Sequence, residues 1–239
     1  MERKEININS IGKIVILKSN RAKHFSIRIS SDAEITVTIP FRVSFKEGIR
    51  FANSKKDWIS KHLSKVEVAK KEKLIFDENV NFKTRNHKLV IKKMDVDDVY
   101  LTINEKFVIL KIPKERDVKE AFIQEAVKYG ITETIRIEAK EFLPTRVKYL
   151  ADRFGFKYNK VFLKNLKSRW GSCSGTNNIN LNIHLIRLPD KVIDYVILHE
   201  LSHTIQKNHS KKFWLLLEST YPNCKKYDKE LKKYSPLYF

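Results

Sequence analysis

The sequence is poor in several residue types, and each shortage excludes a class of protein. Its 239 residues contain two cysteines and six glycines. Two cysteines cannot form a disulfide framework, and so few glycines leave no Gly-rich loop of the P-loop kind for binding phosphate. The longest apolar run has five residues, whereas a membrane-spanning helix needs roughly 20. We therefore expect a globular protein that does not insert into a membrane.

We expect no secretory targeting signal in the first residues. Its first residues, Met1-Glu-Arg-Lys-Glu, lack the apolar region of a secretory signal peptide. We therefore expect a cytoplasmic protein in which Cys173 and Cys224 are reduced thiols. Cys173 is a candidate metal ligand, but a small buried residue in a tight turn is the simpler interpretation, because free cysteine is among the most buried residue types. The sequence does not determine the oligomeric state.

Acidic residues are few compared with basic ones. The chain has 28 Asp plus Glu against 48 Lys plus Arg, which gives a formal net charge of +20. Such a charge attracts polyanions, so non-specific nucleic acid is a candidate partner. The excess is mostly lysine scattered along the chain, without a helix-turn-helix or zinc-finger pattern. Solvated lysine-rich surfaces therefore explain the charge about as well.

The most informative stretch is His199-Glu200-Leu201-Ser202-His203, an H-E-x-x-H pattern within a run of helical periodicity that begins at Pro189-Asp190. Two histidines four residues apart lie on one face of a helix, about one turn from each other. Zinc takes neutral nitrogen ligands at about 2.0–2.1 Å, and a neighbouring carboxylate can deprotonate a zinc-bound water. The spacing predicts one zinc ion per chain, held by His199 and His203, with Glu200 as the general base.

A catalytic zinc site needs a third protein ligand. His209 follows His199 by ten residues, which in an unbroken helix would place it about 15 Å away. The helix must therefore end between them, and we expect the stop at Asn208, because Asn tolerates a left-handed cap. The spacing also fits metzincins, but Gln206 stands where their Gly is expected, and no methionine follows. We favour His209, with Glu218 from the following helix as the alternative ligand.

The chain divides near residue 115 in its sequence pattern. Before that point, alternating apolar residues predict a hairpin at 25–39 and further strands from 89 to 112. Ser44 and Glu47 form a capping box that predicts a helix between these strands. After it, a long helical region is expected to about Arg153, interrupted at Pro144 because proline lacks the amide hydrogen that a helix needs.

Residues 179–186 alternate between apolar and polar side chains. The pattern predicts a strand just before the H-E-x-x-H helix, with Asn180, Asn182 and His184 on one face. In zinc peptidases of this build, such a strand is an edge that pairs with the substrate backbone. We name these three residues as candidate substrate-binding residues, and an ordinary half-buried strand with a solvated face explains the pattern equally well.

Arg169 is a candidate for stabilising negative charge that develops during the reaction, because a fixed guanidinium acts strongly where water is excluded. The alternative is a structural role in which Arg169 stacks on Trp170. Phe213 and Trp214 are expected to be core residues that seal the back of the site.

The segment from Lys167 to Trp214 resembles the signature of the YgjP-like metallopeptidase family, relatives of the SprT-like zinc proteins. The matching features, in order, are the Arg169-Trp170-Gly171-Ser172-Cys173 block, the alternating strand, the H-E-L-x-H helix, and Asn208-His209-Ser210 followed by Phe213-Trp214. Residues 21–59 resemble the family's β-rich leader more loosely. The resemblance implies that His199, His203 and His209 bind zinc and that Glu200 is the catalytic base.

We therefore expect an α+β fold in which a β-rich N-terminal domain (1–115) precedes a helical, zincin-like catalytic domain (116–239) with a small antiparallel sheet. The expected function is that of a zinc metallopeptidase acting on peptide or protein substrates. One alternative is a zinc-dependent phosphoanhydride or nucleotide hydrolase that uses the same ion. Another is a nucleic-acid-associated protein with structural zinc, which an open site with three histidines and an adjacent glutamate disfavours.

Overall fold

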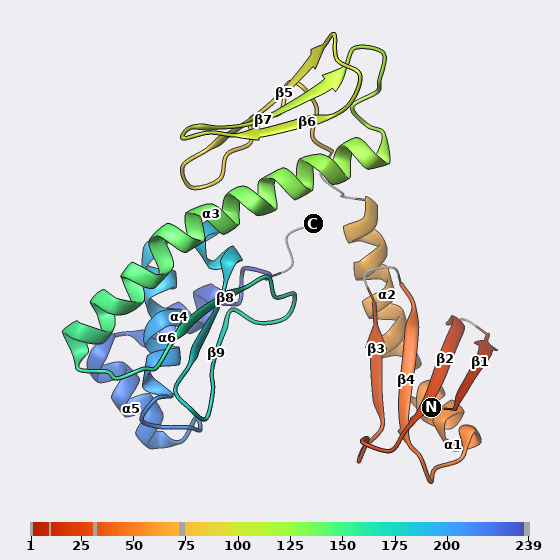
Figure 1. The fold of residues 1–239 in the computed structure, drawn as a ribbon. Coiled ribbons are helices and arrows are strands. Elements are labelled where there is room, and N and C mark those ends of the chain that lie inside the picture. The colour runs from red at the N-terminus through yellow and green to blue at the C-terminus, as the bar shows by residue number, and fades with distance from the viewer. Residues whose placement is uncertain (1, 10, 31–32, 72–74, 237–239) are drawn as a thin grey trace. The chain divides into compact units, whose positions relative to one another are not determined.

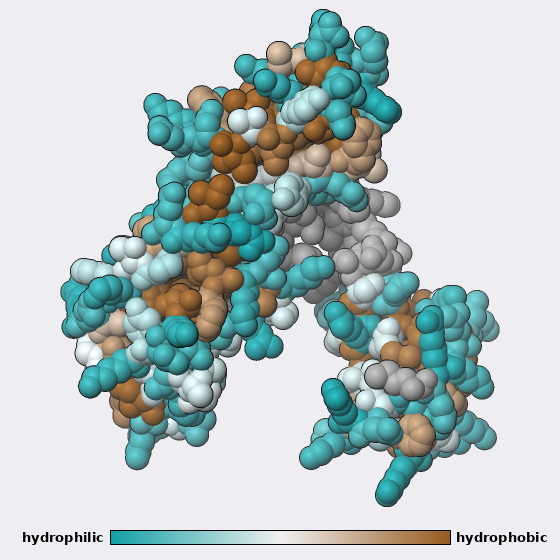
Figure 2. All heavy atoms as spheres, in the orientation of Figure 1, coloured by the Kyte–Doolittle hydropathy of each residue, from teal (hydrophilic) through white to brown (hydrophobic). Residues whose placement is uncertain are grey.

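The computed structural model describes residues 2–9, 11–30, 33–71 and 75–236. The chain forms two compact units, Met1–Leu74 and Ile75–Phe239, which are drawn in Figure 1. Hydrophilic side chains cover most of the visible surface of each unit, as Figure 2 shows. Each unit has its own hydrophobic core.

The first unit is a mixed sheet with two helices. Its described elements are β1 (Arg3–Ile8), β2 (Gly12–Ser19), β3 (Ser26–Ile29), β4 (Ile35–Pro40), α1 (Phe45–Ser54) and α2 (Lys56–Lys71). The strand order is β1-β2-β4-β3, with β2 and β4 parallel and the outer pairs antiparallel. The alternation expected along 35–39 is confirmed, since Ile35, Val37 and Ile39 are buried. The capping box of Ser44 and Glu47 is also confirmed, and it begins α1.

The second unit starts with a three-stranded sheet that packs on a long helix. Its elements are β5 (Lys88–Met94), β6 (Tyr100–Ile103), β7 (Phe107–Pro113) and α3 (Ala121–Phe154), and the strand order is β5-β7-β6. The sheet lies along the first half of α3 (Figure 1). A methyl group at Gly130 of α3 would lie 2.6 Å from Leu101 Cδ1, so the absence of a side chain there allows the close approach of helix and sheet.

Helix α3 runs through Pro144 without interruption over 34 residues, so the predicted break is wrong. The neighbouring Leu143 and Val147 are fully buried, and burying such side chains contributes about 1.5–3 kcal/mol each. That is comparable to the roughly 3 kcal/mol that an interior proline costs. Tertiary packing therefore maintains the helix across this position. Among the described residues, no helix is long and apolar enough to cross a membrane.

The rest of the second unit follows the second half of α3. Its elements are β8 (Val161–Lys164), β9 (Gly171–Cys173), β10 (Ile179–Asn182), the 3-10 helix η1 (Ile183–Arg187), α4 (Asp190–Ser202), α5 (Lys211–Thr220) and α6 (Cys224–Leu231). The small sheet has the order β8-β10-β9 and is mixed, because β10 is parallel to β8 and antiparallel to β9. The antiparallel sheet expected from the sequence is corrected accordingly.

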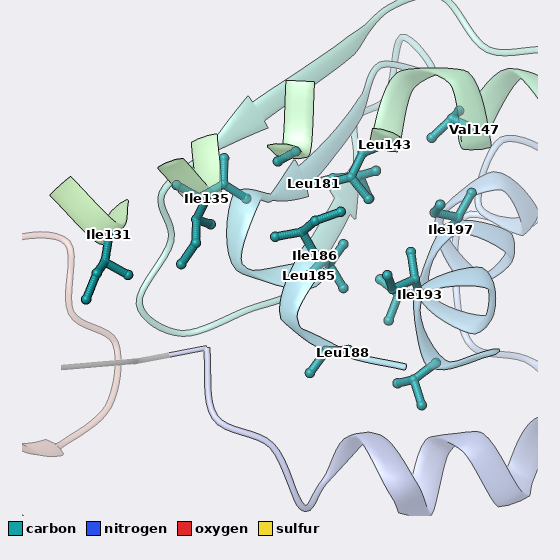
Figure 3. Packing of buried hydrophobic residues seen from close by; sticks show 14 of the residues in the cluster. Ile131, Ile135, Leu143, Val147, Leu181, Leu185, Ile186, Leu188, Ile193 and Ile197 are labelled. Carbon is teal, nitrogen blue, oxygen red and sulfur yellow. The ribbon is translucent and has the colours of Figure 1, made fainter. Parts of the chain in front are cut away.

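The core of this region forms where η1 lies between α3 and α4. Figure 3 shows Leu143 and Val147 of α3, Leu185 of η1, and Ile193 and Ile197 of α4 packed against one another. All five are fully buried. This packing fixes α4, and with it the position of the H-E-x-x-H residues.

The observed division of the chain, between Leu74 and Ile75, differs from the expected division near residue 115. Strands β5 to β7 belong to the second unit because their buried residues, such as Leu110, share one hydrophobic core with α3 residues such as Ile131. The strand-rich N-terminal part is thus two separate sheets, of which β1 to β4 form the sheet of the first unit.

Candidate active site

Helix α4 carries the H-E-x-x-H residues and begins at Asp190, directly after Pro189, as the sequence predicts. From Val192 to Ser202 its residues are buried, except His199, which is half-buried. Helical spacing places Val192 and Val196 on the same face as His199 and His203, and Leu201 on the opposite face. The helix is therefore enclosed nearly all round, and its two histidines face His209 in the chain segment that follows it.

The chain turns back immediately after α4. The helix ends at Ser202, and the next turn is closed by hydrogen bonds from Thr204 N–H to Leu201 O at 2.9 Å and from Gln206 N–H to Ser202 O at 2.9 Å. The predicted stop at Asn208 is therefore wrong. The side chain of Asn208 instead accepts a hydrogen bond from Ser210 N–H at 3.2 Å. This arrangement places His209 in the loop between α4 and α5.

The three histidine side chains converge. His209 Nε2 lies 2.9 Å from His199 Nε2 and 3.1 Å from His203 Nε2. One ring nitrogen from each residue lies within 4.8 Å of the other two, and this is a group that can hold a metal ion. Three nitrogens around a tetrahedral zinc ion would be separated by about 3.3 Å. The two separations from His209 Nε2 are within a few tenths of an ångström of that value.

The environment of these rings favours the neutral form that binds metals. Burial, together with His203 and His209, lowers the pKa of His199 to about 3. Burial also lowers the pKa of His203, against the hydrogen bond to Gln206. His203 Nδ1 donates that bond to the carbonyl oxygen of Gln206 at 2.9 Å. With its hydrogen on Nδ1, the ring has a free lone pair on Nε2, the atom that faces the cluster.

The alternative third ligand, Glu218, is engaged elsewhere. It lies on α5, and its carboxylate accepts hydrogen bonds from Asn223 N–H at 2.8 Å and from Cys224 N–H at 3.2 Å. These bonds satisfy backbone N–H groups at the start of α6 and keep the carboxylate in that position. The structure therefore brings His209, and not Glu218, to the other two histidines.

An aromatic wall lies behind the cluster. The ring of Phe213, which is fully buried, is centred 4.9 Å from the ring of His199, 4.5 Å from that of His203 and 4.8 Å from that of His209. Trp214 lies 6.1 Å from His209 and is partly buried against the same core. Phe213 is therefore a core residue, as expected, whereas Trp214 is only half-buried.

Glu200 is buried beside the cluster, with 7% of its surface exposed. Burial raises the pKa of its carboxyl group to about 8, and the attraction of Arg169 opposes that shift. A cation held by the three histidines would oppose it further, because a nearby positive charge favours the carboxylate. Whether the carboxyl group of Glu200 is protonated therefore depends on the charge beside it.

A pocket of about 170 Å³ opens next to Glu200. Its lining residues are Trp170, Gly171, Tyr195, Val196, His199, Glu200, Asp228 and Leu231. Most of its wall is apolar or aromatic, and the carboxylate of Asp228 from α6 is its second acidic group. Tyr195 Oη donates a hydrogen bond to Asp228 Oδ1 at 3.2 Å. The pocket adjoins both the histidine cluster and the candidate base.

The three candidate substrate-binding residues lie differently from expectation. Strand β10 ends at Asn182 and is the middle strand of its sheet, so its edges are already paired. Asn182 is fully buried, and its side chain bonds the backbone of Leu166, Arg169 and His184. His184 is also buried, with Nε2 3.1 Å from Asn165 Oδ1. Both residues therefore hold the loop before β9 in place, which corrects their assignment to a substrate-facing strand.

Asn180 and Arg169 are nearer to the expected positions. Asn180 is half-buried, and its Nδ2 donates a hydrogen bond to the carbonyl oxygen of Ser172 at 3.3 Å. Arg169 is exposed and close enough to Glu200 to lower the pKa of that carboxyl group. The guanidinium over the Trp170 ring is that of Arg187, at 6.0 Å. Cys173 is half-buried on β9, and burial raises the pKa of its thiol.

Three residues near the cluster were missed by sequence reasoning, namely Gly171, Tyr195 and Asp228. Tyr195 precedes His199 by four residues in α4, so helical spacing could have identified it. Asp228 comes from α6, and no local pattern connects it with α4. Gly171 was visible only as part of a motif, because the contact that explains it is with Glu200.

The family model described as YgjP-like, metallopeptidase domain, matches residues 23–234. Two solved structures are similar over part of the chain, namely the crystal structures of the metallopeptidase zymogens of Pyrococcus abyssi abylysin and of Methanocaldococcus jannaschii jannalysin. Each shares 23% identity and a TM-score of 0.35, and covers 38% of this chain and 94% or 93% of its own. No curated protein matches the sequence.

Proposed function

Because the chain belongs to the YgjP-like metallopeptidase family, we propose that it hydrolyses peptide bonds with one zinc ion bound by His199, His203 and His209. The observation that carries this proposal is the convergence of three imidazole nitrogens beside a buried glutamate. Nitrogen donors in this number, with a fourth position open, are typical of catalytic zinc and not of structural zinc. His209 is exposed, which leaves room for a substrate beside the cluster.

A bound zinc ion would supply a Lewis acid for the scissile carbonyl group and would lower the pKa of a coordinated water. The carboxylate of Glu200 then accepts the proton of the attacking water and later donates it to the leaving amine. Burial raises the pKa of Glu200 to about 8 in the metal-free protein, and a bound cation would lower that pKa and favour the carboxylate that accepts the proton. We assign to Arg169 the stabilisation of the negative charge that develops on the carbonyl oxygen, because its positive charge already acts on the carboxyl group of Glu200.

The edge that would bind the substrate backbone is β9. Two backbone hydrogen bonds lie at the two ends of β9 and join it to β10 and the residues next to β10. Asn182 N–H donates to Trp170 O at 2.8 Å, and Ser174 N–H donates to Asn178 O at 2.9 Å. In an antiparallel pair, bonded residues alternate with residues that point away. Ser172 therefore faces β10, whereas the backbone groups of Gly171 and Cys173 face outward. Within the described ranges, no strand pairs with that side of β9. A substrate chain added there would lie next to Glu200.

The proposal is tested with the zinc-loaded protein and a mixture of unstructured peptides and casein, with cleavage products identified by mass spectrometry. We expect cleavage by the wild type that stops when a chelator is added and returns with zinc. Glu200→Gln should retain zinc and lose cleavage, and Glu133→Gln, a half-exposed position on α3, is the matched control. Hydrolysis of nucleotides or phosphate esters without any peptide cleavage would show that this site acts on phosphate groups and not on peptide bonds.

The net charge of +20 supports a second proposal, that the protein binds nucleic acid without sequence preference. Binding should be visible at low salt and weaken steeply as salt rises, because each neutralised phosphate releases a counterion. A titration of duplex DNA at about 50 mM salt measures this. If no binding is seen at micromolar protein, the lysines form an ordinary solvated surface and do not bind nucleic acid. The peptidase proposal would stand.

A further inference from the structure

We propose that Gly171 is a positioning residue for Glu200, because the absence of a side chain at this position on β9 provides the space that the Glu200 carboxylate occupies. This inference rests on the proposed function, since it concerns the base of that reaction. It assigns a role to the missing side chain of this glycine, whose backbone belongs to the proposed substrate-binding edge.

The geometry at Gly171 is unusually close. A Cβ atom built on Gly171 would lie 2.8 Å from Cγ, 2.8 Å from Oε1 and 3.0 Å from Cδ of Glu200. Non-bonded carbon atoms normally approach to about 3.5–4.0 Å. All three of the nearest atoms belong to the same side chain, so an added methyl group would displace Glu200 specifically.

The requirement for glycine here is one of space and not of backbone conformation. The described glycines with positive φ are Gly12 and Gly155, and Gly171 is not among them. It lies in β9, where it pairs with Leu181. Alanine adopts strand conformations without strain. Substitution at Gly171 therefore changes the contact with Glu200 and leaves the strand and its hydrogen-bonding groups intact.

Packing, and not hydrogen bonding, holds the carboxylate in place. In the part of the chain that the structure describes, no hydrogen bond to the Glu200 side chain is present, although the residue is 7% exposed. A base that abstracts a proton must lie within hydrogen-bond reach of it. The contact with Gly171 thus limits the positions that the carboxylate can take.

The test compares Gly171→Ala with Gly175→Ala. Gly175 lies in the turn after β9, has no neighbour within 4 Å of a built Cβ, and has no positive φ, so it is a matched control. We expect Gly171→Ala to lower kcat about 100-fold, because a displacement of about 1 Å of a catalytic group can have that effect. KM and bound zinc should stay at the wild-type level, since the substrate-facing backbone and the histidines are unchanged. Gly175→Ala should retain the wild-type kcat.

A structural readout makes the test independent of activity. Crystal structures of the zinc-loaded variants should show the Glu200 carboxylate displaced in Gly171→Ala and unmoved in Gly175→Ala. If the wild type cleaves no peptide, the proposed function fails, and the displacement alone still decides the role of Gly171. An unmoved Glu200 with kcat within twofold of the control would overturn the inference.

A failure of Gly171→Ala to fold is also informative. The double variant Gly171→Ala/Glu200→Ala removes the three Glu200 atoms that the methyl group meets. Recovery of the folded state in the double variant would identify Glu200 as the source of the clash and support the inference. A double variant that remains unfolded would contradict it.

Discussion

His209 Nε2 lies 2.9 Å from His199 Nε2, although ten residues separate the two histidines in the sequence. The tight turn at Thr204–Gln206 makes this possible, because it reverses the chain within a few residues of the helix end. The same turn supplies the Gln206 carbonyl oxygen that orients His203. This short turn thus places His209 beside the other histidines and also orients His203.

The first prediction concerns that ligand. His209→Ala should lower the zinc content sharply, because two nitrogen ligands hold zinc much less tightly than three. Glu218→Ala should leave the zinc content unchanged, since its carboxylate serves the start of α6. Metal analysis after dialysis against a weak chelator measures both variants. The reverse result, with zinc lost only in Glu218→Ala, would identify the closing helix as the source of the third ligand.

A second prediction concerns the other side of His199. Its Nδ1 is buried, and no described residue bonds to it, whereas metal-binding histidines ordinarily donate that N–H to a carboxylate, a carbonyl group or water. Asp228 lines the same pocket of about 170 Å³ as His199, and its negative charge favours positive charge at His199. Asp228→Asn should therefore lower zinc affinity about tenfold.

Competition with a zinc-binding dye measures this change in affinity. Asp228 on α6 forms an ion pair with Lys232 at 2.6 Å. Asp152→Asn is the control, because Asp152 forms the same kind of pair with Lys148 at 2.6 Å on α3. Equal affinities in the two variants would show that Asp228 does not act on His199.

The third prediction concerns the contact between α3 and the part of the chain that carries β5, β6 and β7. Glu138 is buried on α3, and its carboxylate accepts hydrogen bonds from the turn at residues 84–87. The donors are Thr84 Oγ1 at 2.6 Å, Arg85 N–H at 3.2 Å, Asn86 N–H at 2.8 Å and His87 Nδ1 at 2.8 Å. Glu138→Ala leaves these buried donors unsatisfied and should lower the free energy of unfolding by about 3 kcal/mol.

Urea denaturation of the metal-free protein measures the loss. Glu133→Ala removes a partly exposed pair with Arg136 on the same helix and should cost less than about 1 kcal/mol. Similar losses in both variants would show that the bonds of Glu138 do not hold the turn.

The fourth prediction is a dependence on pH. Burial, with Arg187 and Arg136, lowers the pKa of His184 to about 4, compared with about 6.5 in an unfolded chain. The unfolded state therefore binds more protons between these values, and stability falls as the pH decreases from about 6.5 to 4. His184→Gln should lose less stability than the wild type over this interval in metal-free protein. Parallel pH dependences for the two proteins would contradict the assignment.

The sequence predicted the chemistry of the site better than the arrangement around it. The H-E-x-x-H helix, its start at Asp190 and the return of His209 follow from local spacing, and local spacing is what a single sequence shows most directly. The stop at Asn208 was wrong because hydrogen bonds in the turn ended the helix earlier. The break at Pro144 was wrong because burial of Leu143 and Val147 outweighs the local cost of proline.

Contacts between residues far apart in the sequence were harder to predict. Alternation along 179–186 does not show that β10 becomes the middle strand or that η1 begins at Ile183, because both depend on pairing with residues 161–173. The unit boundary near residue 74 depends on which helix β5 to β7 cover. Gly171 is meaningful only once Glu200 is seen beside it.

X-ray absorption spectroscopy of the zinc-loaded protein tests the central claim most directly. We predict three imidazole nitrogens and one oxygen from water, all about 2.0–2.1 Å from the metal. His209→Ala should remove one of the nitrogens. A sulfur ligand at about 2.3 Å from a cysteine, or a fourth protein ligand that closes the site, would contradict a catalytic zinc held by three histidines.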